Sequence, residues 1–155
     1  MNTSLVKVWL AASVLAGSAA LAQKGTGIDE GIVRQGLIPI TRSIAGTLEG
    51  IKTGPCKNTT GRAYIGSHLF LRTPENELIN LHLGPANFVD EFISTLATGH
   101  IVRAIAFQTD NLKENNWVAK QVRVNDTELL LRDDSFRPLW AEGNRSPRFN
   151  RKFRW

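Results

Sequence analysis

Short runs in which apolar and polar residues alternate fill the middle of the chain, and glycine, proline, asparagine and aspartate separate them. An alternation of period two places the apolar side chains on one face of an extended backbone, which is typical of half-buried strands. The pattern therefore predicts a mainly β domain. Its strands are expected over 44–53, 67–73, 78–83, 100–109, 117–124 and 127–133.

One segment, 86–96, breaks this alternation with a helical spacing of Phe88, Phe92, Ile93 and Leu96. It is expected to form one short helix after the third strand. A helix at that position in a barrel of short strands is typical of the five-stranded oligonucleotide/oligosaccharide-binding (OB) barrel. The fold class predicted is therefore a small OB-like barrel of five to six strands with one short helix, and an unrelated six-stranded barrel is the alternative.

The N-terminus has the pattern of an export signal. Residues 1–7 carry Lys7 and no acid, and the apolar run 8–21 is shorter than the span of about 20 residues that a bilayer requires. The run closes on Ala20-Leu21-Ala22, which predicts cleavage after Ala22. We expect a periplasmic or secreted protein with a signal peptide over 1–22, and a retained N-terminal anchor helix is the alternative.

The remainder has the length of one domain. Residues 23–42 are rich in glycine and predict a flexible lead-in. The OB-like domain is expected over 43–140. Residues 141–155 are expected to form a separate basic and aromatic tail.

Four short runs give the chain a family resemblance: SHLFLRT at 67–73, LHLGP at 81–85, LLRD at 130–133 and PLW at 138–140. In these runs it resembles a group of poorly characterised exported bacterial proteins with an OB-like domain. The resemblance covers 43–140 and implies the fold but no activity. The chain departs from the group's pattern at His100, where an acidic turn residue is expected, so any role of that acid does not carry over.

No known catalytic motif is found in the sequence. Beyond the expected signal peptide, the chain lacks a Gly-x-Ser-x-Gly elbow, a Ser-x-x-Lys pair, a phosphate-binding glycine loop and a zinc-protease helix. The acidic residues fall in expected turns or on the expected helix surface, where solvation explains them. We therefore expect a protein that is not an enzyme and has no cofactor.

The C-terminal tail interleaves cations with aromatic rings and has no acid after Glu142. This composition is typical of segments that bind anionic surfaces, and it predicts attachment of a non-catalytic accessory module to an acidic protein partner or an anionic membrane surface. Nucleic acid fits by charge, but export argues against it as a partner. A disordered solubilising tail is the alternative. The predicted binding residues are Arg145, Arg148, Phe149, Arg151, Lys152, Phe153, Arg154 and Trp155.

The histidines support a different function. His68 and His82 lie on the two arms of one predicted hairpin and face each other if the loop has an odd number of residues. Two imidazoles and a third ligand, from His100 or a nearby carboxylate, could hold copper or zinc. A structural role for His82 at the Gly84-Pro85 turn is the simpler interpretation, and nucleic-acid or oligosaccharide binding on the barrel face is a further alternative.

Cys56 is the single cysteine, so it cannot form an internal disulfide. Its neighbours predict an exposed loop. We expect a bystander thiol there, and pairing between two chains through an intermolecular disulfide is the alternative.

Overall fold

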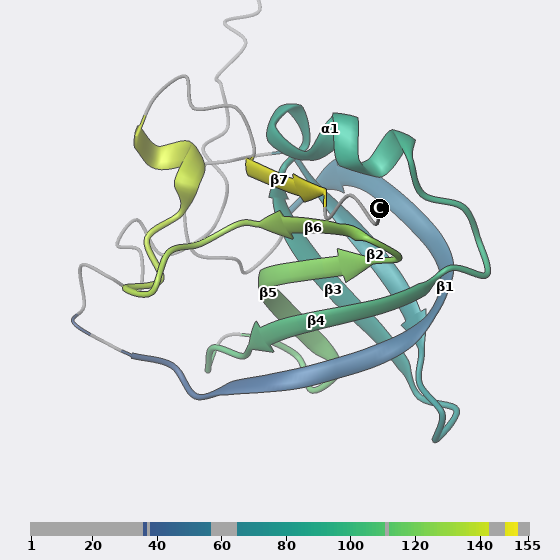
Figure 1. Cartoon of the computed structure of the whole chain (residues 1–155). Coiled ribbons are helices and arrows are strands. Elements are labelled where there is room, and N and C mark those ends of the chain that lie inside the picture. Colours follow the sequence, from purple (N-terminus) through teal and green to yellow (C-terminus); the bar gives the residue numbers. More distant parts are fainter. Residues whose placement is uncertain (1–35, 37, 57–64, 111, 143–147, 152–155) are drawn as a thin grey trace, which may run out of the picture.

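The computed structural model describes residues 36, 38–56, 65–110, 112–142 and 148–151, and Figure 1 shows their arrangement. The described part is mainly β, with one sheet of seven strands, one α-helix and one 3-10 helix. Its elements are β1 (Thr41–Pro55), β2 (Ile65–Arg72), β3 (Leu78–Pro85), α1 (Ala86–Ser94), β4 (Ile101–Phe107), β5 (Asn116–Val124), β6 (Thr127–Leu130), η1 (Leu139–Glu142) and β7 (Arg148–Arg151).

Five strands close into a ring. The order is β3-β2-β1-β4-β5, and a parallel pairing of β5 with β3 joins the two ends. The first part of β5 pairs with β3, and the later part pairs with β6, which continues to β7. The ring leaves β6 and β7 as an extension beside β5 (Figure 1).

β1 is long enough to pair with two neighbouring strands. Its first half pairs with β4 and its second half with β2, and the register shifts between Leu48 and Gly50. Such a bulge bends a strand and increases its twist, as ring closure requires. A Cβ at Gly46 would lie 2.9 Å from the carbonyl oxygen of Arg72, so only glycine allows this close approach.

The core fills the inside of the ring. Alternate residues of the strands are fully buried, Leu69 and Leu71 on β2 and Leu81 and Leu83 on β3 among them. Burial of each leucine side chain contributes about 1.5–3 kcal/mol. α1 adds Phe88, Val89 and Phe92 to the same core. No helix in the described part of the chain is long and apolar enough to cross a bilayer.

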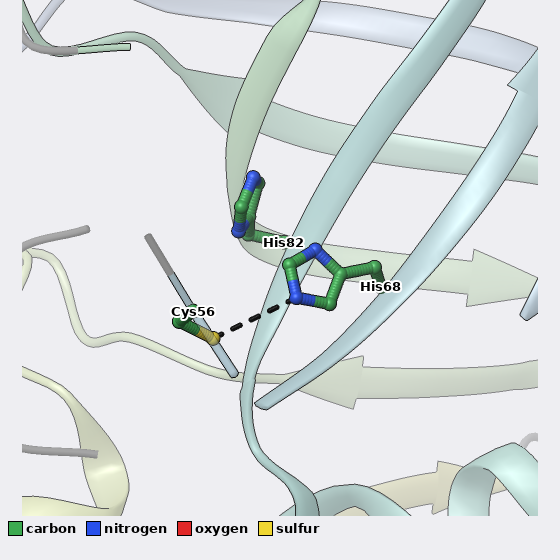
Figure 2. Close-up of side chains that lie close together, drawn as sticks. All are labelled: Cys56, His68 and His82. Atoms are coloured by element: carbon green, nitrogen blue, oxygen red, sulfur yellow. Dashed lines mark hydrogen bonds between the residues drawn. The ribbon is translucent and has the colours of Figure 1, made fainter. Parts of the chain in front are cut away.

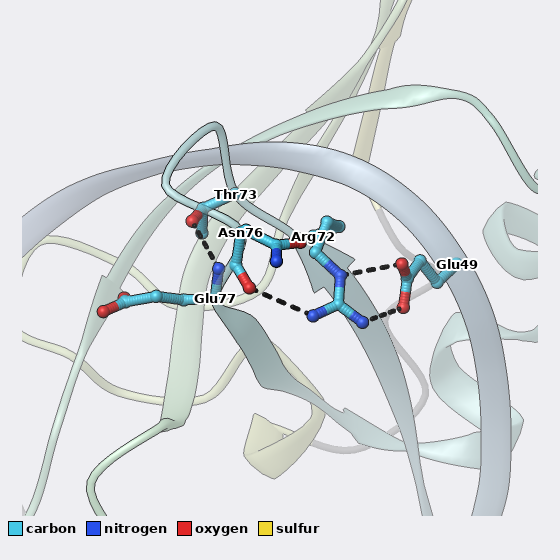
Figure 3. A network of polar contacts seen from close by, with 5 residues as sticks. All are labelled: Glu49, Arg72, Thr73, Asn76 and Glu77. Atoms are coloured by element: carbon cyan, nitrogen blue, oxygen red, sulfur yellow. Dashed lines mark hydrogen bonds and ion pairs between the residues drawn. The ribbon is translucent and has the colours of Figure 1, made fainter.

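A polar network fixes the far end of the β2–β3 hairpin (Figure 3). Arg72 donates two hydrogen bonds to the carboxylate of Glu49, at 2.8 and 3.0 Å, and a third to the carbonyl oxygen of Asn76 at 3.1 Å. The bond from Arg72 lowers the pKa of Glu49. Asn76 has a φ of 65°, a left-handed conformation that asparagine tolerates. The network thereby links β1 to the turn that sets the hairpin register.

The structure confirms a mainly β fold with one short helix after the third strand. Several boundaries differ from those predicted. β1 begins at Thr41, α1 ends at Ser94, and β6 ends at Leu130. The predicted signal peptide, and the lead-in up to residue 35, lie outside the described residues.

One strand was not expected. Part of the predicted tail, Arg148–Arg151, forms β7 and pairs antiparallel with β6. The sequence there lacks an apolar alternation, so the strand is specified by backbone pairing with its neighbour. The tail is therefore not wholly separate from the domain.

Candidate metal centre

The two hairpin histidines face each other. Arg72 pairs with Leu78, so the loop between them has an odd number of residues, and His68 pairs with His82 as expected. Their ring centroids are 4.2 Å apart. A register shift between Ser67 and His68 follows directly, and bulges of this kind re-aim side chains.

Both histidines alternate with core leucines and therefore lie on the outer face of the ring, yet each is only 8 % exposed. Their burial means that other parts of the chain cover this face. One of them is the segment that follows β1.

That segment carries Cys56. The antiparallel pairing of β1 and β2 continues to Pro55 opposite Ile65, which brings the next residue to the histidines. Cys56 Sγ lies 3.6 Å from Nε2 of His68, and Figure 2 shows the thiol directed at that ring. Ligand atoms of Cys56, His68 and His82 all lie within 4.8 Å of one another. The expected exposure of Cys56 is therefore wrong, since the residue is half-buried and lies beside the two histidines.

A chain of amide side chains orients His68. The Asn80 side chain donates through Nδ2 to Oδ1 of Asn116 at 2.7 Å, which leaves its own oxygen facing His68. His68 Nδ1 donates to that oxygen at 3.2 Å. With the proton on Nδ1, the lone pair of Nε2 points to the thiol. Such outer contacts fix the tautomer of metal-binding histidines.

Both imidazoles are neutral near pH 7. Burial lowers the pKa of His82 to about 4, and the neighbouring His68 adds to the shift. Burial also lowers the pKa of His68, against the raising effect of its bond to Asn80. Nδ1 of His82 is buried and has no hydrogen-bond partner among the described residues. This atom does not make the bond to the Gly84-Pro85 turn that a structural role predicted.

The charges around the cluster are positive. Arg132 is buried, donates to the carbonyl oxygen of Ala119, and lies over the rings of Phe107 and Trp140. Its charge lowers the pKa of His82, and that of Lys52 lowers the pKa of His68. Burial lowers the pKa of Arg132 itself to about 9. Within the described residues, no carboxylate belongs to the cluster.

His100 lies elsewhere. It precedes β4, and its Nδ1 accepts a hydrogen bond from the backbone N–H of Ala97 at 3.3 Å. The structure therefore does not bring His100 to the hairpin histidines, and the residue beside them is Cys56. No sequence motif predicts the cluster of Cys56, His68 and His82, because these residues are brought together only by strand pairing.

The predicted tail-binding residues lie largely outside the part of the chain that the structure describes. Arg148, Phe149 and Arg151 belong to β7, and their side chains lie outside the described part of the structure. Arg145, Lys152, Phe153, Arg154 and Trp155 fall outside the described residues altogether.

Comparison with known proteins identifies the family to which the chain belongs. No curated protein sequence and no solved structure matches the chain significantly. Residues 41–129, from the start of β1 to the middle of β6, match the family model described as the MamS/MamX magnetosome protein family. Because the match spans more than half of the chain, the protein belongs to the MamS/MamX magnetosome protein family.

Proposed function

We propose that this protein is a non-catalytic, exported accessory protein of the magnetosome that binds one transition-metal ion through Cys56, His68 and His82. The observation that carries the proposal is the convergence of two imidazoles from the middle of β2 and β3 and one thiol from the residue that follows β1. Thiolate and imidazole are the ligands that copper and zinc prefer.

The spacing of the ligands supports a shared ion. With metal–sulfur and metal–nitrogen bonds of about 2.3 and 2.0 Å, and angles between tetrahedral and trigonal, sulfur and nitrogen ligands of one ion are about 3.5–3.8 Å apart. Cys56 Sγ and His68 Nε2 are 3.6 Å apart. The thiol would lose its proton on binding, as metal-bound cysteines do.

The buried Nδ1 of His82 also favours a ligand. A buried polar atom without a partner costs about 1–3 kcal/mol, and this atom has none among the described residues. A His82 held only for structure would be expected to use it.

Metal addition to the full chain tests the proposal. We expect one zinc or copper ion per chain and a higher melting temperature, because an ion present at about 100 times its Kd stabilises the folded state by about 2.7 kcal/mol. Cys56→Ser, His68→Ala and His82→Ala should each abolish the effect, and the matched control His100→Ala should keep it. An equal loss in His100→Ala, or no retained ion, would contradict the proposal.

A second candidate function is catalysis by an activated thiol, and it rests on the order of three side chains. Cys56, His68 and Asn80 are linked as thiol, imidazole and amide, the order of nucleophile, base and orienting group in papain-like enzymes. It predicts fast alkylation of Cys56 by iodoacetamide that needs Asn80 and is insensitive to added metal. The metal site predicts the opposite, namely protection of the thiol by the bound ion.

A further inference from the structure

The donor set narrows the choice of ion. The cluster offers one sulfur and two imidazole nitrogens, and within the described residues it includes no carboxylate. Iron(II) and manganese(II) in oxygen-rich sites depend on such carboxylates, whereas soft thiolates select copper(I) and zinc. The cluster therefore disfavours an ion that needs hard oxygen ligands.

The number of donors separates copper(I) from zinc. Structural zinc sites are almost always closed by four protein ligands, whereas copper(I) is stable with three. The polar side chains next to the cluster already have partners. Asn80 Oδ1 accepts from His68, and the hydroxyls of Thr53 and Ser67 hydrogen-bond to each other at 3.0 Å. A fourth protein ligand among these neighbours would break an existing hydrogen bond.

The charge balance of the site also favours copper(I) over a divalent ion. A thiolate and a monovalent ion sum to zero, whereas a thiolate and a divalent ion leave one positive charge. The buried Arg132 and the nearby Lys52 already make the surroundings positive. An additional buried positive charge is costly without a counter-ion.

We infer that the Cys56–His68–His82 site is selective for copper(I), held by one thiolate and two imidazoles in a three-coordinate arrangement, over zinc(II) and iron(II). This inference rests on the proposed function, because it names the ion of the same site. Asn80 then acts as a positioning residue that keeps His68 Nε2 directed at the ion.

Competition between metals tests the inference. The full chain is prepared without oxygen and titrated with copper(I) against a chromophoric copper(I) chelator, and separately with zinc(II) and iron(II). We expect one copper(I) per chain, displacement of zinc by stoichiometric copper(I), and loss of iron(II) on gel filtration. X-ray absorption should show one sulfur and two nitrogen ligands.

The variants distinguish a built site from a lone thiol. His68→Ala and His82→Ala should each weaken copper(I) binding well over tenfold, and His100→Ala should not change it. If a histidine variant does not fold by circular dichroism, the variant of the same histidine to Gln serves in its place, because it removes the imidazole and keeps the thiol. Zinc or iron that stoichiometric copper(I) fails to displace would overturn the selectivity and leave metal binding intact, whereas retention of no ion would overturn both.

Discussion

A Cβ added to Gly66 would lie 2.4 Å from Sγ of Cys56. The thiol therefore rests directly on the backbone of β2, in space that any side chain would fill. This contact fixes the position of the Cys56 thiol relative to the imidazole rings of His68 and His82.

Gly66→Ala should displace the thiol and weaken metal binding at least tenfold. Displacement of a residue that binds the ion directly lowers the affinity more than loss of a residue that only contacts a ligand. It should also lower the stability of the chain, since the new Cβ would meet the carbonyl oxygen of Gly84 at 3.0 Å. Gly54→Ala is the matched control, because its Cβ would meet only Lys52 Cε, at 3.9 Å. Titration of both variants with the metal measures the difference, and equal affinities would show that Gly66 does not position Cys56.

Asn80→Ala should weaken metal binding about 10- to 100-fold while leaving the ion-to-chain ratio unchanged, as removal of an outer contact to a metal-binding histidine does. The reason is the lost acceptor for His68 Nδ1, which frees the ring to turn or change tautomer. Asn87→Ala, at an exposed position of α1, is the control. An unchanged affinity in Asn80→Ala would mean that packing alone holds the ring.

Stability should fall as the pH is lowered from about 6.5 to about 4. The folded pKa of His82 is about 4, below the unfolded value of 6.5, so only the unfolded chain takes up a proton in this window. Stability is therefore full above pH 6.5, and the loss is on the order of 3 kcal/mol by pH 4. Urea unfolding at several pH values measures it. His82→Gln should remove this part of the slope and His100→Gln should keep it. A slope that persists unchanged in His82→Gln would assign the effect to other groups.

Arg132→Met should leave stability near that of the original chain or raise it, since methionine fills the aromatic site without the cost of a buried charge. Arg132→Ala should destabilise by about 2–4 kcal/mol through the cavity that it leaves between Phe107 and Trp140. Denaturant unfolding compares the two, with Arg123→Met, at an exposed position, as control. A strongly destabilised Arg132→Met would show that the guanidinium itself is needed, through its bond to Ala119.

Attachment through the tail is tested by two truncations. A chain ending at Glu142 lacks β7, whereas one ending at Arg151 keeps this strand and lacks Lys152, Phe153, Arg154 and Trp155. Pull-down from the exported fraction should recover a partner with the full chain, lose it with the Arg151 truncation, and show weaker retention at higher salt. Recovery by the truncated chain would remove those four residues from the attachment surface.

Much of the fold follows from the alternation of apolar residues. That pattern placed the β2–β3 hairpin and α1, because both depend on neighbours close in sequence. β7 was missed because it has no such pattern and is held by pairing with β6. Only part of the candidate site could be predicted from the sequence. The pairing of His68 with His82 follows from a short loop, whereas the approach of Cys56 depends on how far the β1–β2 pairing continues, and local sequence does not encode that.

The ring is closed by three parallel pairs, which join Asn80, Leu81 and His82 to residues 116–118. Parallel strands must be brought together over a long stretch of chain, so such a seam is slow to form. Two groups of the candidate site, Asn80 and His82, belong to that seam. An ion bound there would hold the two ends of the ring together, and it should slow hydrogen exchange at the backbone amides of the start of β5, a strand that supplies none of the three ligands.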